Sequence, residues 1–189
     1  MITFFHLLSK CIISISFSML LIGKVVASNT PMAIICDQTY ALCTSAACIP
    51  DPVNSKNAIC DCEVYQGKSA GYNSCSQRKP YLDQYKVMHV ISTFSFEQFA
   101  TKKSMTCPQG FLWTDCVDHS CTVDPKNKQR ALCNCKIHSS KSFITFGGEC
   151  NQQNCKTGFW SGATESTSKG LRQALMKEIT VPSKAQCKR

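Results

Sequence analysis

The strongest constraint on this chain is a pattern of six cysteines that occurs twice. The first copy contains Cys36, Cys43, Cys48, Cys60, Cys62 and Cys75. The second copy contains Cys107, Cys116, Cys121, Cys133, Cys135 and Cys150. Both share the spacing C-x4-C-x11-C-x-C, and the residues between agree too: A-I-C-D-C ends at Cys62 and A-L-C-N-C ends at Cys135. Agreement at so many positions predicts an internal duplication.

Alternating residue types within each copy predict a β-hairpin with one cysteine-lined face. In the extended segment 58–65, Cys60 and Cys62 lie on one face and Asp61 on the other, and segment 131–137 repeats the pattern. Cysteines two apart in a strand are separated by about 7 Å between their Cα atoms and point the same way. We therefore expect Cys60 and Cys62 to bond different partners, as should the two cysteines of the second C-x-C.

The remaining connectivity within each copy stays open, because six cysteines allow many pairings. Cys155 and Cys187 have no equivalents in the first copy. We therefore expect these two to bond each other and to tie the C-terminal tail to the second unit.

The first 27 residues predict a secretory signal peptide. Lys10 precedes an apolar run that is too short to span a bilayer, and small residues lead to an expected cleavage after Ala27. Removal of this segment also removes Cys11, which leaves 14 of the 15 cysteines. An even number in an exported chain favours a disulfide framework. The absence of an N-x-S/T acceptor favours a bacterial source. We expect a secreted or periplasmic protein without a transmembrane segment in its mature chain.

The predicted fold class is mainly β with a C-terminal helix, disulfide-rich, in two tandem similar units. The units would span residues 28–103 and 104–189. Segment 158–162 reads as a strand or turn, and a helix from Ser166 to Ile179 follows, with Ser166 or Thr167 as its cap. A shorter helix is expected over Ser95–Lys102.

One dense group of acid and base residues stands out. Asp115, Asp118 and His119 form the sequence D-C-V-D-H, which a secreted hydrolase could use for acid–base chemistry. The first copy lacks these residues, so a solvated loop is the competing interpretation. The C-x-C pairs, with His119 or His138, could also be drawn as a zinc site. An exported chain favours disulfides over metal ligands, and we expect no cofactor.

Basic residues are concentrated in the C-terminal half, and the whole chain carries a formal charge of +9. They give the candidate binding residues Lys126, Lys128, Arg130, Lys169, Arg172 and Lys177. Trp113 and Trp160 are added as candidates, because tryptophan is enriched at recognition surfaces, although a core position is the alternative for both. A surface of this kind attracts anionic lipid head groups or glycans.

Two resemblances accompany these patterns. The spacing C-x6-C-x4-C-x11-C-x-C-x12-C of the first copy is similar to that of EGF-like modules. The unit A-L-C-T-S-A-A-C, which ends at Cys48, and A-I-C-D-C, which ends at Cys62, resemble a tandem unit of small exported cysteine-rich bacterial proteins. This second resemblance covers most of the mature chain and implies no site residue.

The sequence therefore predicts a secreted binding protein that contacts an anionic lipid or glycan surface through its basic C-terminal half. A hydrolase at Asp115, Asp118 and His119 and an inhibitor of an extracellular enzyme are the alternatives. Nucleic acid is not expected as a partner.

Overall fold

A computed structural model of the chain describes residues 32–95, 102–147, 151, 153–157 and 159–177. The predicted signal peptide, most of the predicted helix Ser95–Lys102, and the cysteines Cys150 and Cys187 lie outside the described residues. The first strands are β1 (Ile34–Leu42), β2 (Ala47–Pro50), β3 (Asn57–Gly71), β4 (Tyr81–Leu82), β5 (Met88–Ser95) and β6 (Met105–Cys107). The remaining elements are β7 (Trp113–Asp115), β8 (Ser120–Val123), β9 (Arg130–His138), β10 (Phe143–Thr145), α2 (Asn154–Thr157), β11 (Phe159–Gly162) and α3 (Glu165–Met176). The chain is thus mainly β, with α3 as its one long helix among these residues, as the sequence predicts.

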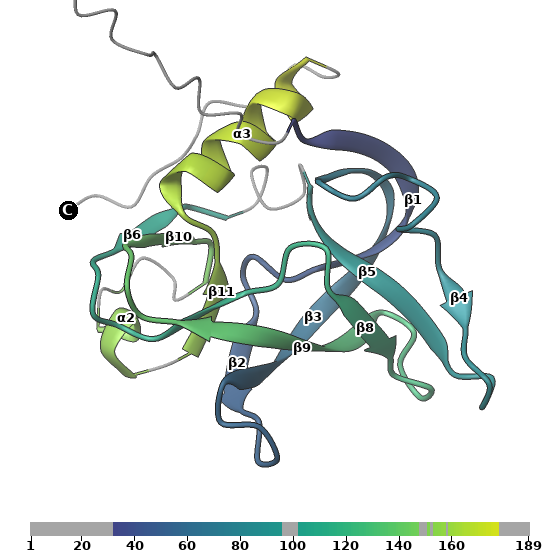
Figure 1. Ribbon diagram of the computed structural model, residues 1–189, viewed down its shortest axis with the longest axis horizontal. Helices are drawn as coiled ribbons and strands as arrows, with labels where there is room; N and C mark the ends of the chain where they lie inside the picture. Colours follow the sequence, from purple (N-terminus) through teal and green to yellow (C-terminus); the bar gives the residue numbers. More distant parts are fainter. Residues whose placement is uncertain (1–31, 96–101, 148–150, 152, 158, 178–189) are drawn as a thin grey trace, which may run out of the picture.

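The two predicted hairpins form the centre of a nine-stranded sheet (Figure 1). Strand β3 pairs antiparallel with β2 in the first hairpin, and β9 pairs antiparallel with β8 in the second. The long strands β3 and β9 also pair with each other, with Cys60 opposite Cys133. The hairpins are therefore not separate modules, because their inner strands share one ladder.

The sheet closes on itself on both sides of this central pair. On one side β3, β1, β5, β8 and β9 form a ring, which the parallel pair β1–β5 completes. On the other side β3, β2, β11, β7 and β9 form a ring, completed by the parallel pair β11–β7. Strands β5 and β11 therefore each cross to the hairpin of the other half of the chain.

The two rings have matching registers. Ser92 on β5 donates its backbone N–H to the His119 carbonyl at 2.8 Å, and Ser161 on β11 donates to the Ala46 carbonyl at 3.1 Å. The hydroxyls of the two serines accept in return from the same residues, at 3.3 Å from His119 N and 3.2 Å from Ala46 N. Each hydroxyl is a second acceptor for a backbone N–H that also donates within the turn before the hairpin, Ala46 to the Cys43 carbonyl and His119 to the Cys116 carbonyl.

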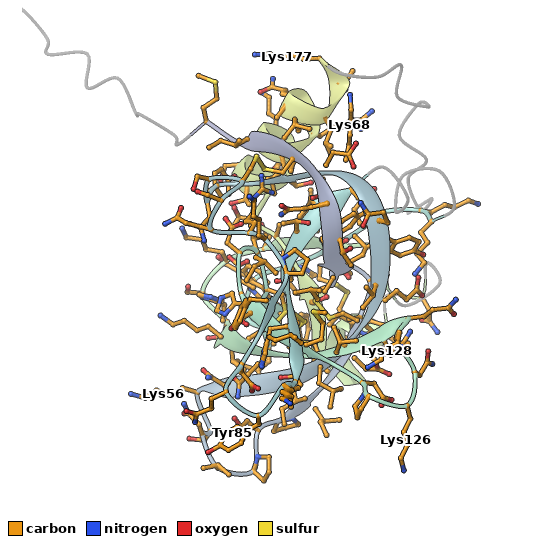
Figure 2. All side chains as sticks on the ribbon, turned by 90° about the vertical axis from the view of Figure 1, so that its right-hand side faces the viewer. Lys56, Lys68, Tyr85, Lys126, Lys128 and Lys177 are labelled. Atoms are coloured by element: carbon orange, nitrogen blue, oxygen red, sulfur yellow. A yellow bond between two sulfur atoms is a disulfide. The ribbon has the colours of Figure 1, made fainter. Side chains whose placement is uncertain are left out.

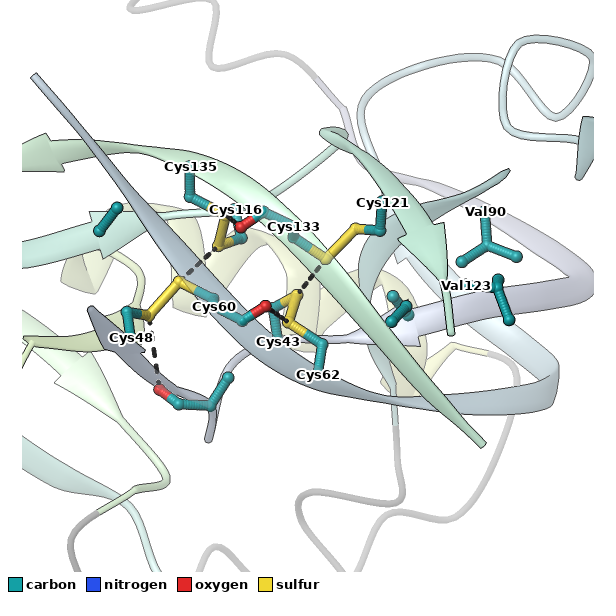
Figure 3. Packing of buried hydrophobic residues seen from close by; sticks show 14 residues of the cluster. Cys43, Cys48, Cys60, Cys62, Val90, Cys116, Cys121, Val123, Cys133 and Cys135 are labelled. Atoms are coloured by element: carbon teal, nitrogen blue, oxygen red, sulfur yellow. Dashed lines mark hydrogen bonds between the residues drawn. A yellow bond between two sulfur atoms is a disulfide. The ribbon is translucent and has the colours of Figure 1, made fainter. Parts of the chain in front are cut away.

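Four disulfides lie together in one buried cluster along β3 and β9 (Figure 3). Their pairs are Cys43–Cys62, Cys48–Cys60, Cys116–Cys135 and Cys121–Cys133. The prediction that Cys60 and Cys62 bond different partners is confirmed, and the second C-x-C behaves in the same way. Bonds that close loops of this size contribute roughly 3 kcal/mol each in the chain-entropy account.

Sulfur atoms from the two halves also contact each other in this core. The Cys43 and Cys133 Sγ atoms lie 3.1 Å apart, and those of Cys116 and Cys60 lie 3.6 Å apart. Ala41, Ala46, Ala58 and Ala131 belong to the same cluster. Their small side chains fit there because a disulfide leaves little room for a larger neighbour on the same strand. Cystine side chains therefore make up most of this cluster.

One predicted disulfide is wrong. Cys155 bonds Cys107, with 5.7 Å between their Cα atoms, instead of Cys187. Strand β6 carries Cys107, and its pairing with β10 places this cysteine in the same cluster as Cys155 and Trp113. Cys107 and Cys155 are 48 residues apart, so their proximity arises only in the folded chain.

Candidate functional site: a basic groove beside the C-terminal helix

Helix α3 follows directly from β11 and is held by its N-terminal cap. The Thr164 hydroxyl accepts the Thr167 N–H at 3.2 Å, which satisfies one of the unpaired amides of the first turn. The helix runs from Glu165 to Met176, so the predicted start at Ser166 and cap at Ser166 or Thr167 are slightly late. The predicted end at Ile179 lies outside the described residues.

One face of α3 is buried and the other is basic. Leu171 and Leu175 are fully buried against a cluster that includes Phe94 and Phe146. The opposite face carries the exposed residues Lys169, Gln173 and Lys177. Neither of these lysines forms an ion pair within the part of the chain that the structure describes. Burial of the leucine stripe thus fixes which side of the helix presents its cations.

A groove of about 980 Å³ lies between α3 and the residues that lead into β1. Its apolar lining residues are Met32, Ala33, Ile35, Ala174 and Met176. The two lysines and polar side chains form the rest of the wall. Both methionines of the groove are highly exposed to solvent for apolar side chains, Met32 to 80% and Met176 to 51%.

A second, polar cleft of about 560 Å³ opens at the N-terminal end of the same helix. It is lined by Gln109, Ser140, Lys141, Ser142, Thr164, Glu165, Ser166 and Lys169. Ser166 and Lys169 line both hollows. Lys169 therefore stands between an apolar groove and a hydrophilic cleft, an arrangement that suits a ligand with an apolar part and a charged part.

The structure divides the predicted basic surface in two. Lys177 lies at one end of the molecule, whereas Lys126 and Lys128 lie at the other, on the loop between β8 and β9 (Figure 2). Arg172 is partly buried and lines a smaller hollow together with Lys169. The four lysines among the predicted binding residues are exposed, but they do not form a single surface.

Arg130 is engaged within the sheet. Its guanidinium lies 2.5 Å from Asp61 Oδ2 and 3.9 Å from Glu63 Oε1, both on the neighbouring strand β3. The hydrogen bond with Asp61 raises the pKa of Arg130 above its ordinary value. This residue cross-links β9 to β3 and is a poor candidate for ligand binding.

The predicted role of the tryptophans is only partly compatible with their positions. Trp113 is 2% exposed and stacks on Phe143 with 5.3 Å between ring centroids, so the prediction that it reaches a recognition surface is wrong. The Trp113 ring also lies beside that of His138, with 5.0 Å between the ring centroids. Trp160 is partly buried against the same cluster. Both rings serve the packing of β7 and β11, which was the alternative interpretation.

The structure gives Asp118 a structural role. Its Oδ2 accepts the backbone N–H groups of Tyr72 at 2.6 Å and Asn73 at 3.1 Å, where the chain turns after β3. Asp118 has a left-handed backbone, with φ at 60°. The carboxylate therefore faces the protein interior and tethers the two halves of the chain.

The Asp115 side chain is also engaged locally, and His119 is held through its backbone. Asp115 Oδ1 accepts the Val117 N–H at 3.1 Å, and burial raises the pKa of Asp115 above its ordinary value. The backbone of His119 bonds Ser92 in both directions. Among the described residues, the groups of three metal-ligating side chains within 4.8 Å are all cysteines that already form disulfides. The D-C-V-D-H sequence thus does not converge on a common metal-binding point.

The sequence patterns did not predict two features of the site region. Arg78 is completely buried, donates to the Ile34 carbonyl at 2.7 Å and contacts Cys36 Sγ. Burial lowers its pKa from the ordinary arginine value, while the charge of Asp118 opposes this shift. The groove beside α3 was also missed, because residues 32–35 and 166–177 meet only in the folded chain. Only the helical periodicity of the second segment could have signalled it.

The chain matches no known protein family, and neither curated proteins nor solved structures provide a match. No helix among the described residues is long and apolar enough to cross a membrane. The fold and the groove together define a disulfide-stapled β protein with a basic, partly apolar hollow beside its helix.

Proposed function

We propose that this chain is a secreted, disulfide-stabilised binding protein that takes an anionic lipid in the groove beside α3. The observation that carries the proposal is the combination of open apolar side chains and unpaired lysines in one hollow. An acyl chain would lie along Met32 and Met176, while Lys169 would face the negatively charged head group and Lys177 would add positive charge at the other end of the groove. The apolar floor favours a lipid over a sulfated glycan, since a glycan has no apolar segment to bury.

The proposal includes export of the chain. Residues 1–27 would act as a cleaved signal peptide in a bacterial cell and deliver the protein outside the cytoplasm. The six disulfides support this part of the proposal, because such bonds persist in oxidising compartments.

Internal duplication is the proposed origin of the fold. The matching hairpin registers and the matching serine hydrogen bonds of β5 and β11 support two similar units. In this scheme the groove combines both units, because α3 belongs to the second unit whereas Met32, Ala33 and Ile35 belong to the first.

The contribution of the groove lysines to the binding free energy can be given a magnitude. A lysine near an anionic bilayer contributes about 1 kcal/mol, so the two groove lysines together contribute about 2 kcal/mol. Loss of that contribution corresponds to a roughly 30-fold weaker affinity. The attraction should fall with added salt, because surface charges are screened.

The test is co-sedimentation with phosphatidylcholine vesicles that contain phosphatidylglycerol, across a salt series. We expect binding by the wild type, and a loss of at least about 30-fold in the double variant Lys169→Glu, Lys177→Glu. The matched control is Lys126→Glu, Lys128→Glu, which changes net charge equally at the far end of the molecule (Figure 2). That control should retain most of the affinity.

Three outcomes would overturn the proposal. The first is no vesicle binding at any salt concentration. The second is an equal loss in both double variants, since binding would then follow total charge and not the groove. The third is salt-sensitive binding to heparin without binding to vesicles, which would assign the basic face to a glycan.

A further inference from the structure

We propose that the polar cleft next to the groove selects the lipid head group, and that it favours a phosphodiester with free hydroxyls. This inference rests on the proposed function, because the groove must first hold the lipid. It adds a class of ligand: an anionic phospholipid with a glycerol or inositol head group.

The position of the cleft supports a head-group site. The groove runs along α3, the cleft lies at its N-terminal end, and the two share Ser166 and Lys169 as lining residues. An acyl chain in the groove would bring its phosphate to Lys169. The substituent beyond the phosphate would then lie between α3 and the loop that carries Lys141.

The lining of the cleft favours hydroxyl groups. Ser140 and Ser142 are exposed, and their side chains have no hydrogen-bond partner among the described residues. A serine hydroxyl both donates and accepts, so these side chains are complementary to a polyol. The Thr164 hydroxyl differs, because it is already bonded within the cap of α3.

Charge in the cleft sets the preference for a phosphodiester. Lys141 and Lys169 supply two positive charges, whereas Glu165 supplies one negative charge. A phosphodiester carries a single negative charge and leaves Glu165 to accept a hydrogen bond from a head-group hydroxyl. A phosphomonoester carries additional negative charge near pH 7, which Glu165 repels. Choline offers no hydroxyl and carries a positive charge of its own.

The experiment compares two anionic lipids at equal surface charge. Phosphatidylcholine vesicles would contain either phosphatidylglycerol or phosphatidic acid, with the composition adjusted to the same zeta potential. We expect the full-length mature protein to bind the phosphatidylglycerol vesicles more tightly, by about fivefold for one hydrogen bond to a neutral hydroxyl.

Two variants separate the contributions. Glu165→Gln should strengthen binding to phosphatidic acid and so reduce the preference, because the amide removes the repulsion. Ser140→Ala with Ser142→Ala should weaken binding to phosphatidylglycerol by about fivefold and leave phosphatidic acid unchanged. Circular dichroism of each variant checks that the fold is retained.

The outcomes distinguish this inference from the proposed function. Equal binding to both vesicle types, unaffected by either variant, would overturn head-group selection and leave lipid binding in place. Binding to neither vesicle type would overturn both. A preference for phosphatidic acid would also overturn the inference, since it would show that charge alone governs the cleft.

Discussion

At the scale of single residues, Asp118 illustrates how a cluster of acids can be structural. Its carboxylate serves two backbone amides and lies beside Gly71 and the buried Arg78. A Cβ atom at Gly71 would lie 2.4 Å from Asp118 Oδ1 and 2.8 Å from Arg78 Nη1. The glycine is therefore required by this close approach, and the three residues form one packed unit.

This arrangement predicts that Asp118→Ala destabilises the protein by roughly 2–4 kcal/mol, since two amides and a buried guanidinium lose an acceptor or counter-charge. Asp118→Asn should cost less, because asparagine retains an oxygen acceptor and tolerates the left-handed backbone. Urea unfolding measures both. Vesicle binding by the folded fraction should not change. An unchanged unfolding midpoint for the alanine variant would contradict the structural role.

At the scale of elements, the junction between β11 and α3 positions the groove. Gly162 ends β11, and a Cβ atom there would lie 2.6 Å from the Ile144 carbonyl oxygen. The neighbouring backbone hydrogen bonds between Ile144 and Ala163 hold the junction in both directions. The helix therefore leaves the sheet at a point where the backbone of β11 lies directly against that of β10.

We predict opposite effects for two glycine-to-alanine changes near this junction. Gly162→Ala should destabilise by about 1–3 kcal/mol, because the new methyl meets backbone that cannot easily move. Gly170→Ala, within α3, meets only Tyr72 Oη at 3.7 Å and should stabilise by about 0.5–1 kcal/mol. Thermal unfolding followed by circular dichroism compares them. Equal effects on the unfolding temperature would show that the junction is less tight than the structure indicates.

At the scale of the whole molecule, the disulfides link distant parts of one closed sheet. The central four lie within hairpins, whereas Cys36–Cys75 and Cys107–Cys155 span 39 and 48 residues. Each half of the chain donates a strand to the hairpin of the other. Neither half would bury its cysteine-lined face without the other.

Peptide mapping of the non-reduced mature protein tests this organisation. We expect the six bonds that the structure contains, including Cys107–Cys155, and no free thiol in the denatured protein. A thiol count of zero would require that Cys150 and Cys187, the two remaining half-cystines, are also oxidised. Recovery of a peptide that joins Cys155 to Cys187 would contradict the connectivity.

The sequence alone determined the local features of this protein. Period-two alternation defined the two hairpins and their inward cysteines, and strand geometry required separate partners for Cys60 and Cys62. Periodicity of 3.6 residues located α3, although its cap lies slightly earlier. These features depend on neighbours within a few residues, so the sequence carries them directly.

The tertiary structure decided everything that depends on distant segments meeting. It paired β5 with β8 and β11 with β2, and it joined Cys107 to Cys155. It separated Lys126 from Lys177, and it placed Asp118 under a turn of the other half. Burial of the shared cysteine face sets the strand pairing. The strand that completes each ring is distant in the sequence, so no local pattern predicts it. The groove exists for the same reason, since the start of β1 lies beside α3 only after the rings have closed.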